Sequence, residues 1–147
     1  MFNFDGGFFT FAILAIIASF LRIVLLNRQM QGMNRRVIDN RKAYPHVGLG
    51  YGKRKMTRCW LLVSADEMGN IMHAELMKGW SMFAKLKPYE AINGCNMHEI
   101  ADEVAIMPSD VDGRTSQAAT MACKQILQRL QDQTEEQSLL EEVNSND

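Results

Sequence analysis

The sequence predicts an α+β protein in which a single N-terminal transmembrane helix is followed by a small cytosolic domain. Three observations predict this class: a 19-residue apolar run at residues 8–26, two strand-like runs around a turn-forming segment, and an amphipathic stretch near the C-terminus. We expect the domain to hold an antiparallel β-hairpin or a three-stranded meander, covered on one side by the C-terminal helix. The chain beyond residue 42 is long enough for only one such domain.

Residues 8–26 (FFTFAILAIIASFLRIVLL) have the length and composition of a membrane-spanning helix. At about 1.5 Å per residue they span roughly 28 Å, close to the ~30 Å of bilayer hydrocarbon. Arg22 lies near one end of the run, where its long side chain can reach the interface. A buried core helix is a weaker alternative, because a chain of this size rarely surrounds so apolar a helix. A cleaved signal is another, but residues 1–7 contain no Lys or Arg.

The charges on the two sides of the span predict its orientation. Asp5 is the only charged side chain before it, whereas six cations lie at its end or just after it: Arg22, Arg28, Arg35, Arg36, Arg41 and Lys42. Short segments rich in Lys and Arg stay in the cytoplasm. We therefore expect a single-pass protein of the bacterial cell membrane, with residues 1–7 outside the cell and the domain inside.

The net charge of −1 hides a strong asymmetry along the chain. Residues 1–60 carry ten Lys or Arg and two acids, whereas residues 61–147 carry six Lys or Arg and fifteen acids. The basic half includes a juxtamembrane segment, residues 27–47, and a cluster formed by Lys53, Arg54, Lys55 and Arg58. Anionic lipid head groups explain these cations most simply, at about 1 kcal/mol per cation near the surface. DNA phosphate or an acidic protein partner would also suit the cluster.

The domain is expected to occupy residues 48–130. Before it, residues 27–42 carry a thin apolar stripe, so either the membrane helix continues or an interfacial helix follows it. Alternating glycines at Gly48, Gly50 and Gly52 predict a hinge or a tight loop. A nucleotide-binding loop is disfavoured there, because the spacing GxxxxGK[ST] is absent and no strand is expected before it.

Residues 57–65 and 71–78 predict the hairpin, with a reversal at residues 66–70 (DEMGN). If Ala65 faces Ile71, both faces of the hairpin are too apolar to lie in water, and both need covering. Residues 80–86 can add a third strand ended by Pro88. A helix near residues 116–130, capped by Asp112 or Thr115, is the expected cover for one face. The polar, acidic tail at residues 131–147 is expected to be disordered.

The sequence offers no convincing catalytic, metal or cofactor site. The best metal candidate is Cys95-x-x-His98 with acids after it, but no second pair of ligands has the spacing that zinc needs. His73 is expected to be a satisfied core histidine. The three cysteines, Cys59, Cys95 and Cys123, are expected to be reduced thiols, and none lies in an elbow that would expose a nucleophile. We therefore expect a protein that is not an enzyme and needs no cofactor.

The order of several motifs resembles the glucitol operon activator family, GutM. The residues that carry the resemblance are the three alternating glycines, a basic cluster and an apolar strand, followed by Asp66-x-x-Gly69, Lys78-Gly79, Phe83 and Gly94. The resemblance covers roughly residues 8–130 and does not extend to the tail. It implies a bacterial activator of the sorbitol (glucitol) phosphotransferase genes.

The residues themselves leave two functions open. No pair of short helices joined by a tight turn is expected, so a helix-turn-helix reader of DNA is missing. The chain would then be a membrane-anchored regulator that acts through a protein partner, such as a transcriptional regulator. The alternative is an accessory module of the sorbitol phosphotransferase transporter without direct DNA contact.

Overall fold

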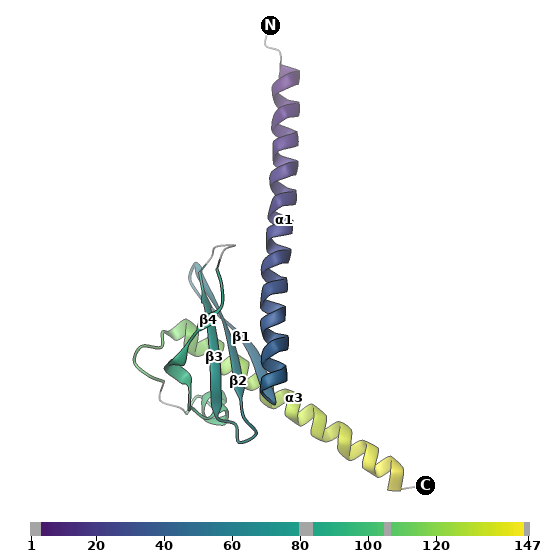
Figure 1. Ribbon diagram of the computed structural model, residues 1–147, viewed down its shortest axis with the longest axis vertical. Helices are drawn as coiled ribbons and strands as arrows, with labels where there is room; N and C mark the ends of the chain where they lie inside the picture. The colour runs from purple at the N-terminus through teal and green to yellow at the C-terminus, as the bar shows by residue number, and fades with distance from the viewer. Residues whose placement is uncertain (1–3, 80–83, 105–106, 146–147) are drawn as a thin grey trace.

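The computed structural model describes residues 4–79, 84–104 and 107–145, and it confirms the predicted α+β class (Figure 1). A long N-terminal helix leads into a four-stranded antiparallel sheet with strand order β1-β2-β3-β4, and a C-terminal helix packs on the sheet. The elements are α1 (Phe4–Ala43), β1 (His46–Arg54), β2 (Thr57–Ala65), β3 (Ile71–Lys78), β4 (Lys87–Pro88), the 3₁₀ helix η1 (Glu90–Ile92), α2 (Met97–Ala101) and α3 (Gly113–Ser145).

Helix α1 runs without a break through the apolar segment and the basic segment after it. Of the two alternatives that the sequence left open, the structure therefore has the continuing helix. Side chains of the apolar part are exposed, among them Phe11 at 76% and Phe20 at 69%, and this part is long and apolar enough to cross a membrane. In the second half, Met33 and Asn40 are buried. Their spacing places them on one face of the helix.

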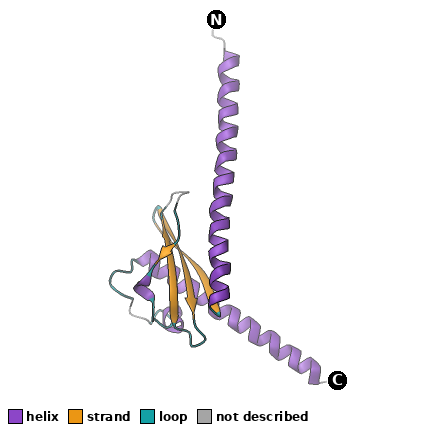
Figure 2. Cartoon of the chain, in the orientation of Figure 1, coloured by secondary structure: helices purple, strands orange, loops and turns teal. Residues whose placement is uncertain are grey.

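Two helices, α1 and α3, lie next to the sheet (Figure 2), and residue contacts place them on opposite faces. One face packs on the first half of α3 and forms the main apolar core, with Leu61, Val63 and Ile71 fully buried. The other face meets the second half of α1 through contacts such as Ser64–Asn40, at 3.2 Å between the side-chain oxygens. The prediction that neither face of the hairpin can lie in water is confirmed.

The hairpin itself forms with the predicted register at its turn, where Ala65 pairs with Ile71. The next pair is Ser64 with His73, so Met72 is an extra residue that shifts the register. A β-bulge of this kind turns all later side chains of the strand to the opposite face. The side chains of β3 after Met72 therefore lie on the other faces from those that an unbroken register predicts: Ala74 and Leu76 belong to the main core.

The predicted hinge at Gly48, Gly50 and Gly52 is wrong, because all three lie within β1 and pair with β2. Their backbone is ordinary strand, and none has a positive φ. What they provide is space: a Cβ at Gly50 would overlap the carbonyl oxygen of Ala118, and those at Gly48 and Gly52 would overlap carbonyls of the same helix. The glycines let α3 approach the strand more closely than any side chain would permit.

Two further segments differ from the sequence prediction. Of the predicted third strand, residues 80–83 lie outside the described residues, and residues 84–86 have no regular structure; Pro88 lies within the two-residue edge strand β4. Beyond residue 130, where the sequence predicts disorder, α3 continues to Ser145 with residues 131–139 exposed. Nucleation is the costly step in helix formation, so a helix fixed by packing on the sheet extends readily into a polar segment.

The close approach of α3 to β1 gives a direct test of this packing. We expect Gly50→Ala to lower the free energy of unfolding by more than about 2 kcal/mol, because the helix backbone must move away from the strand. Thermal unfolding of the full chain in detergent measures it. Gly32→Ala is the matched control: it has open space around its Cβ and lies in a helix, where alanine is favoured by about 1 kcal/mol. Equal melting temperatures for the two variants would contradict the packing.

Candidate functional site

The predicted basic cluster lies at the turn between β1 and β2. Lys53 and Arg54 end β1, Lys55 occupies the turn with a φ of 53°, and Arg58 is the second residue of β2. All four residues are exposed. Among the described residues no carboxylate forms an ion pair with any of them. We call this group the basic tip.

The β1–β2 turn, which carries the basic tip, is at the end of the sheet that lies in the direction of the N-terminal end of α1 (Figure 1). Across the sheet, Tyr51, Trp60 and Met77 lie side by side, and the Met77 sulfur is 3.7 Å from the Gln29 side-chain nitrogen of α1. The tip lies two or more residues further along the strands, which adds about 7 Å or more at 3.3 Å per residue. Because Ser64 meets Asn40, this direction runs toward the N-terminus of α1. The tip therefore lies near the level at which the apolar run ends.

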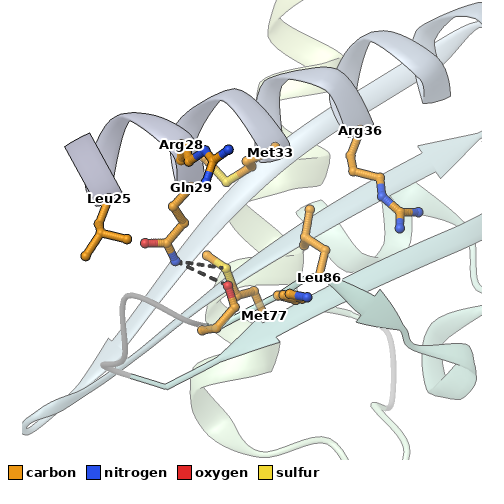
Figure 3. A pocket seen from close by; sticks show the side chains of 10 residues that line it. Leu25, Arg28, Gln29, Met33, Arg36, Met77 and Leu86 are labelled. Carbon is orange, nitrogen blue, oxygen red and sulfur yellow. Dashed lines mark hydrogen bonds between the residues drawn. The ribbon is translucent and has the colours of Figure 1, made fainter. Parts of the chain in front are cut away.

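A pocket of about 490 Å³ opens at the same level, between α1 and the end of β3 (Figure 3). From α1 it is lined by Leu25, Arg28, Gln29, Gly32, Met33 and Arg36, and from the sheet side by Met77, Ala84, Lys85 and Leu86. The Gln29 side chain points across the gap and donates a hydrogen bond of 3.3 Å to the carbonyl of Ala84. This bond ties the segment after β3 to α1 and so closes one wall of the pocket.

A polar cluster holds α1 to the sheet further along the helix. Arg36 Nη1 lies 3.1 Å from Glu75 Oε1, and His73 Nε2 lies 3.3 Å from the same oxygen. The ring of His73 also stacks on Tyr44, with 6.3 Å between the centroids. Only 4% of the Glu75 side chain is exposed, and its Oε2 has no hydrogen-bond partner among the described residues. His73 thus has a partner, as the sequence predicts, but it is not a core histidine: 31% of its side chain is exposed, and it lies outside the main core.

Sequence reasoning missed Glu75, although a signal was present. Glutamate is rare in a strand as apolar as residues 71–78 (IMHAELMK), and a buried carboxylate needs a charged or hydrogen-bonding partner. Arg36 supplies it here. If α1 turned away from this position, Arg36 would leave Glu75 and the buried carboxylate would lose its ion-pair partner. The ion pair therefore favours one rotation of α1 on the sheet.

The remaining motif residues shape turns and the start of α3. Asp66 accepts hydrogen bonds from the backbone of Met68 and Asn70, which lowers its pKa, and Gly69 completes this turn with a φ of 82°. Gly79 and Gly94 also have positive φ values, of 121° and 84°. Backbone with such φ values is strained for any residue with a side chain, so these two positions favour glycine. Phe83 lies outside the described residues.

Lys78 is the motif residue with a clear electrostatic role. Its Nζ lies 3.2 Å from Asp112, which also meets Arg114 at 2.8 Å. Asp112 caps α3, as the sequence predicted, by accepting hydrogen bonds from the backbone and the hydroxyl of Thr115, each at 2.8 Å. Partial burial alone would raise the pKa of Asp112, but these hydrogen bonds hold it well below its usual value.

The described His, Cys, Asp and Glu side chains do not gather into a metal site. No group of three or more His, Cys, Asp or Glu side chains is placed to hold a metal. Cys59 and Cys123 are buried within the core, and burial raises the pKa of Cys123 to about 12. Such a thiol is a poor nucleophile, since the thiolate is the reactive form.

The fold and these surfaces define a small α+β domain carried on a helix that is long and apolar enough to span a membrane. The family model described as glucitol operon activator protein (GutM) matches residues 10–120. This match covers most of the chain, so the chain belongs to the GutM family, a family of regulators rather than enzymes. No curated protein and no solved structure matches the chain.

The cap at Asp112 makes the stability of the domain depend on pH in the acid range. A carboxyl whose pKa falls on folding stabilises the native state above its unfolded value of 3.8, and this contribution is lost as the pH falls below it. Asp112→Ala should therefore lose on the order of 1–2 kcal/mol at pH 6 and much less at pH 3. Denaturant unfolding of the full chain at both pH values measures the difference. A loss that is the same at pH 3 would rule out the ionised cap.

Proposed function

We propose that this GutM protein is a membrane-anchored activator of glucitol operon expression that acts through a protein partner in the cytoplasm. Family membership implies the activator role. The observation that supports the indirect mechanism is the position of the basic tip at the level where the apolar run of α1 ends. Cations at that level face anionic lipid head groups and are not free to follow a DNA groove.

The shapes of the helices also argue against direct reading of DNA. A recognition helix must be exposed and able to enter the major groove. Within the described domain, α2 has five residues and η1 has three, while the first half of α3 is packed against β1 and β2. The exposed second half of α3 carries Asp132, Glu135 and Glu136. These acids would be repelled by phosphate.

The partner is proposed to be a transcriptional regulator, or else a subunit of the sorbitol phosphotransferase transporter. The exposed part of α3 extends beyond the sheet and is not covered by another element (Figure 1). This acidic helix offers a surface to a partner in the cytoplasm. The membrane anchor is as consistent with a transporter subunit as with a transcriptional regulator, because it holds the domain at the membrane in which a transporter lies.

The basic tip provides the test between partner and DNA. The purified full chain should show no preference for the operon control region over unrelated DNA at physiological salt, while a sorbitol-operon reporter still depends on the protein in cells. Under direct DNA contact, changing Lys53, Arg54, Lys55 and Arg58 to Gln would instead abolish specific binding and reduce the salt dependence by about 3–4 in the logarithmic slope.

A matched variant separates the tip from total charge. It changes four other exposed cations to Gln: Arg35, Arg41, Lys42 and Lys87. Specific, salt-sensitive retardation of operon DNA by the wild-type chain and by this variant, but not by the tip variant, would overturn the proposal.

The topology of the anchor is tested separately. In a Cys95→Ser background, a cysteine at Asn3 should react with an impermeant thiol reagent in intact cells, because the cations that follow the span keep that side in the cytoplasm. A cysteine at Met68, whose side chain is 78% exposed in the turn after β2, should react only after the cells are opened. The reverse pattern would place the domain outside the cell and end any role in transcription.

A further inference from the structure

The pocket between α1 and the end of β3 has apolar and cationic side chains on both of its walls (Figure 3). Its interior is mainly apolar, with Leu25, Met33, Met77 and Leu86 among its lining. Its volume of about 490 Å³ lies in the range of about 300–1,000 Å³ that is typical of small-molecule sites. Sites of this kind select their ligand through a few polar groups.

The charged groups of this pocket are all cations. Arg28, Arg36 and Lys85 line it, and no carboxylate does. Arg36 is already paired with Glu75. Arg28 and Lys85 have no ion-pair partner among the described residues, so their charges remain available to an anion. The ligand that suits these walls carries a negative charge beside an apolar portion.

The position of the pocket along α1 identifies the class of that ligand. Leu25 belongs to the last turn of the apolar run, and Arg28 follows one turn later. The pocket therefore begins where bilayer hydrocarbon would end and extends through the depth of the head groups. A second cation-lined pocket, between Arg41, His46 and Arg129, lies about 20 Å further along the helix and out of reach of lipid.

We propose that the pocket between α1 and β3 binds the head group of one anionic phospholipid. The lipid phosphate is held by Arg28 and Lys85, and the glycerol lies against Leu25. The hydrogen bond from Gln29 to the carbonyl of Ala84 keeps the two walls together. This inference rests on the proposed membrane anchor. The inference adds a defined lipid site to the proposed anchor. A general attraction of basic residues to the membrane surface would not require such a site.

The experiment measures lipid retained by the intact chain. The full-length protein is extracted in mild detergent from membranes that contain phosphatidylglycerol and phosphatidylethanolamine, and bound lipid is counted by native mass spectrometry. We expect one phosphatidylglycerol per chain. The double variant Arg28→Gln/Lys85→Gln should retain about tenfold less, since each cation contributes to binding near an anionic surface. Arg41→Gln/Arg129→Gln, the matched control from the remote pocket, should retain as much as wild type.

Four outcomes would overturn the site. They are equal losses in the two double variants, equal retention of both lipids, loss of lipid only when the basic tip is changed to Gln, and displacement of the lipid by millimolar inorganic phosphate. The last would assign the pocket to a soluble anion. Failure of the anchor is distinguished beforehand: a chain released from membranes by alkaline carbonate would refute the span itself, whereas a chain that stays in the membrane without a bound lipid refutes only the pocket.

Discussion

The packing of the second half of α1 on the sheet is the contact on which the other features depend. It is made by Gln29 at one end and by the Arg36–Glu75 ion pair and Asn40 further along. Because these contacts are spaced over three turns, they fix both the rotation of the helix and the direction of the strands relative to it. The basic tip and the pocket at Leu25 take their positions from that direction. Without this contact, the cations of the basic tip would have no defined position along α1.

The opposite face of the sheet achieves its packing by a different means. There, the glycines of β1 remove side chains so that the backbone of α3 approaches the strand, and small residues on the helix, Ala118 and Ala122, meet them. Close approach leaves no room for a slip of one residue, since any Cβ on this side of β1 would overlap a carbonyl. The face toward α1 is held by an ion pair and hydrogen bonds, and the face toward α3 by close packing of the helix backbone on the strand. The sheet is thus fixed on both sides by interactions that tolerate little rearrangement.

Much of the fold follows from the sequence, and the exceptions have physical causes. The apolar run, the hairpin with Ala65 opposite Ile71, and the cap at Asp112 each follow from local composition. The bulge at Met72 does not, because it depends on contacts with distant residues: after it, Ala74 and Leu76 join the main core while Glu75 pairs with Arg36 of α1. The glycines of β1 were predicted to form a hinge since their usual role is conformational, whereas here they make room for a helix more than sixty residues away. Glu75 stands out in the sequence as a carboxylate in an apolar strand, but the sequence alone does not show that Arg36 is its partner.

The connection between anchor and domain limits how such an activator works. Helix α1 is unbroken to Ala43, and only Tyr44 and Pro45 separate it from β1. With α1 across a membrane, as we propose, a domain joined this closely would stay within a few tens of ångströms of the bilayer and could not search a volume as one on a long flexible linker would. The proposed partners would then have to come to the membrane or already lie there. The short connection would also raise the effective concentration of the domain toward membrane-bound partners. Under this proposal the activator would gain specificity from its location and would not need a DNA-reading element of its own.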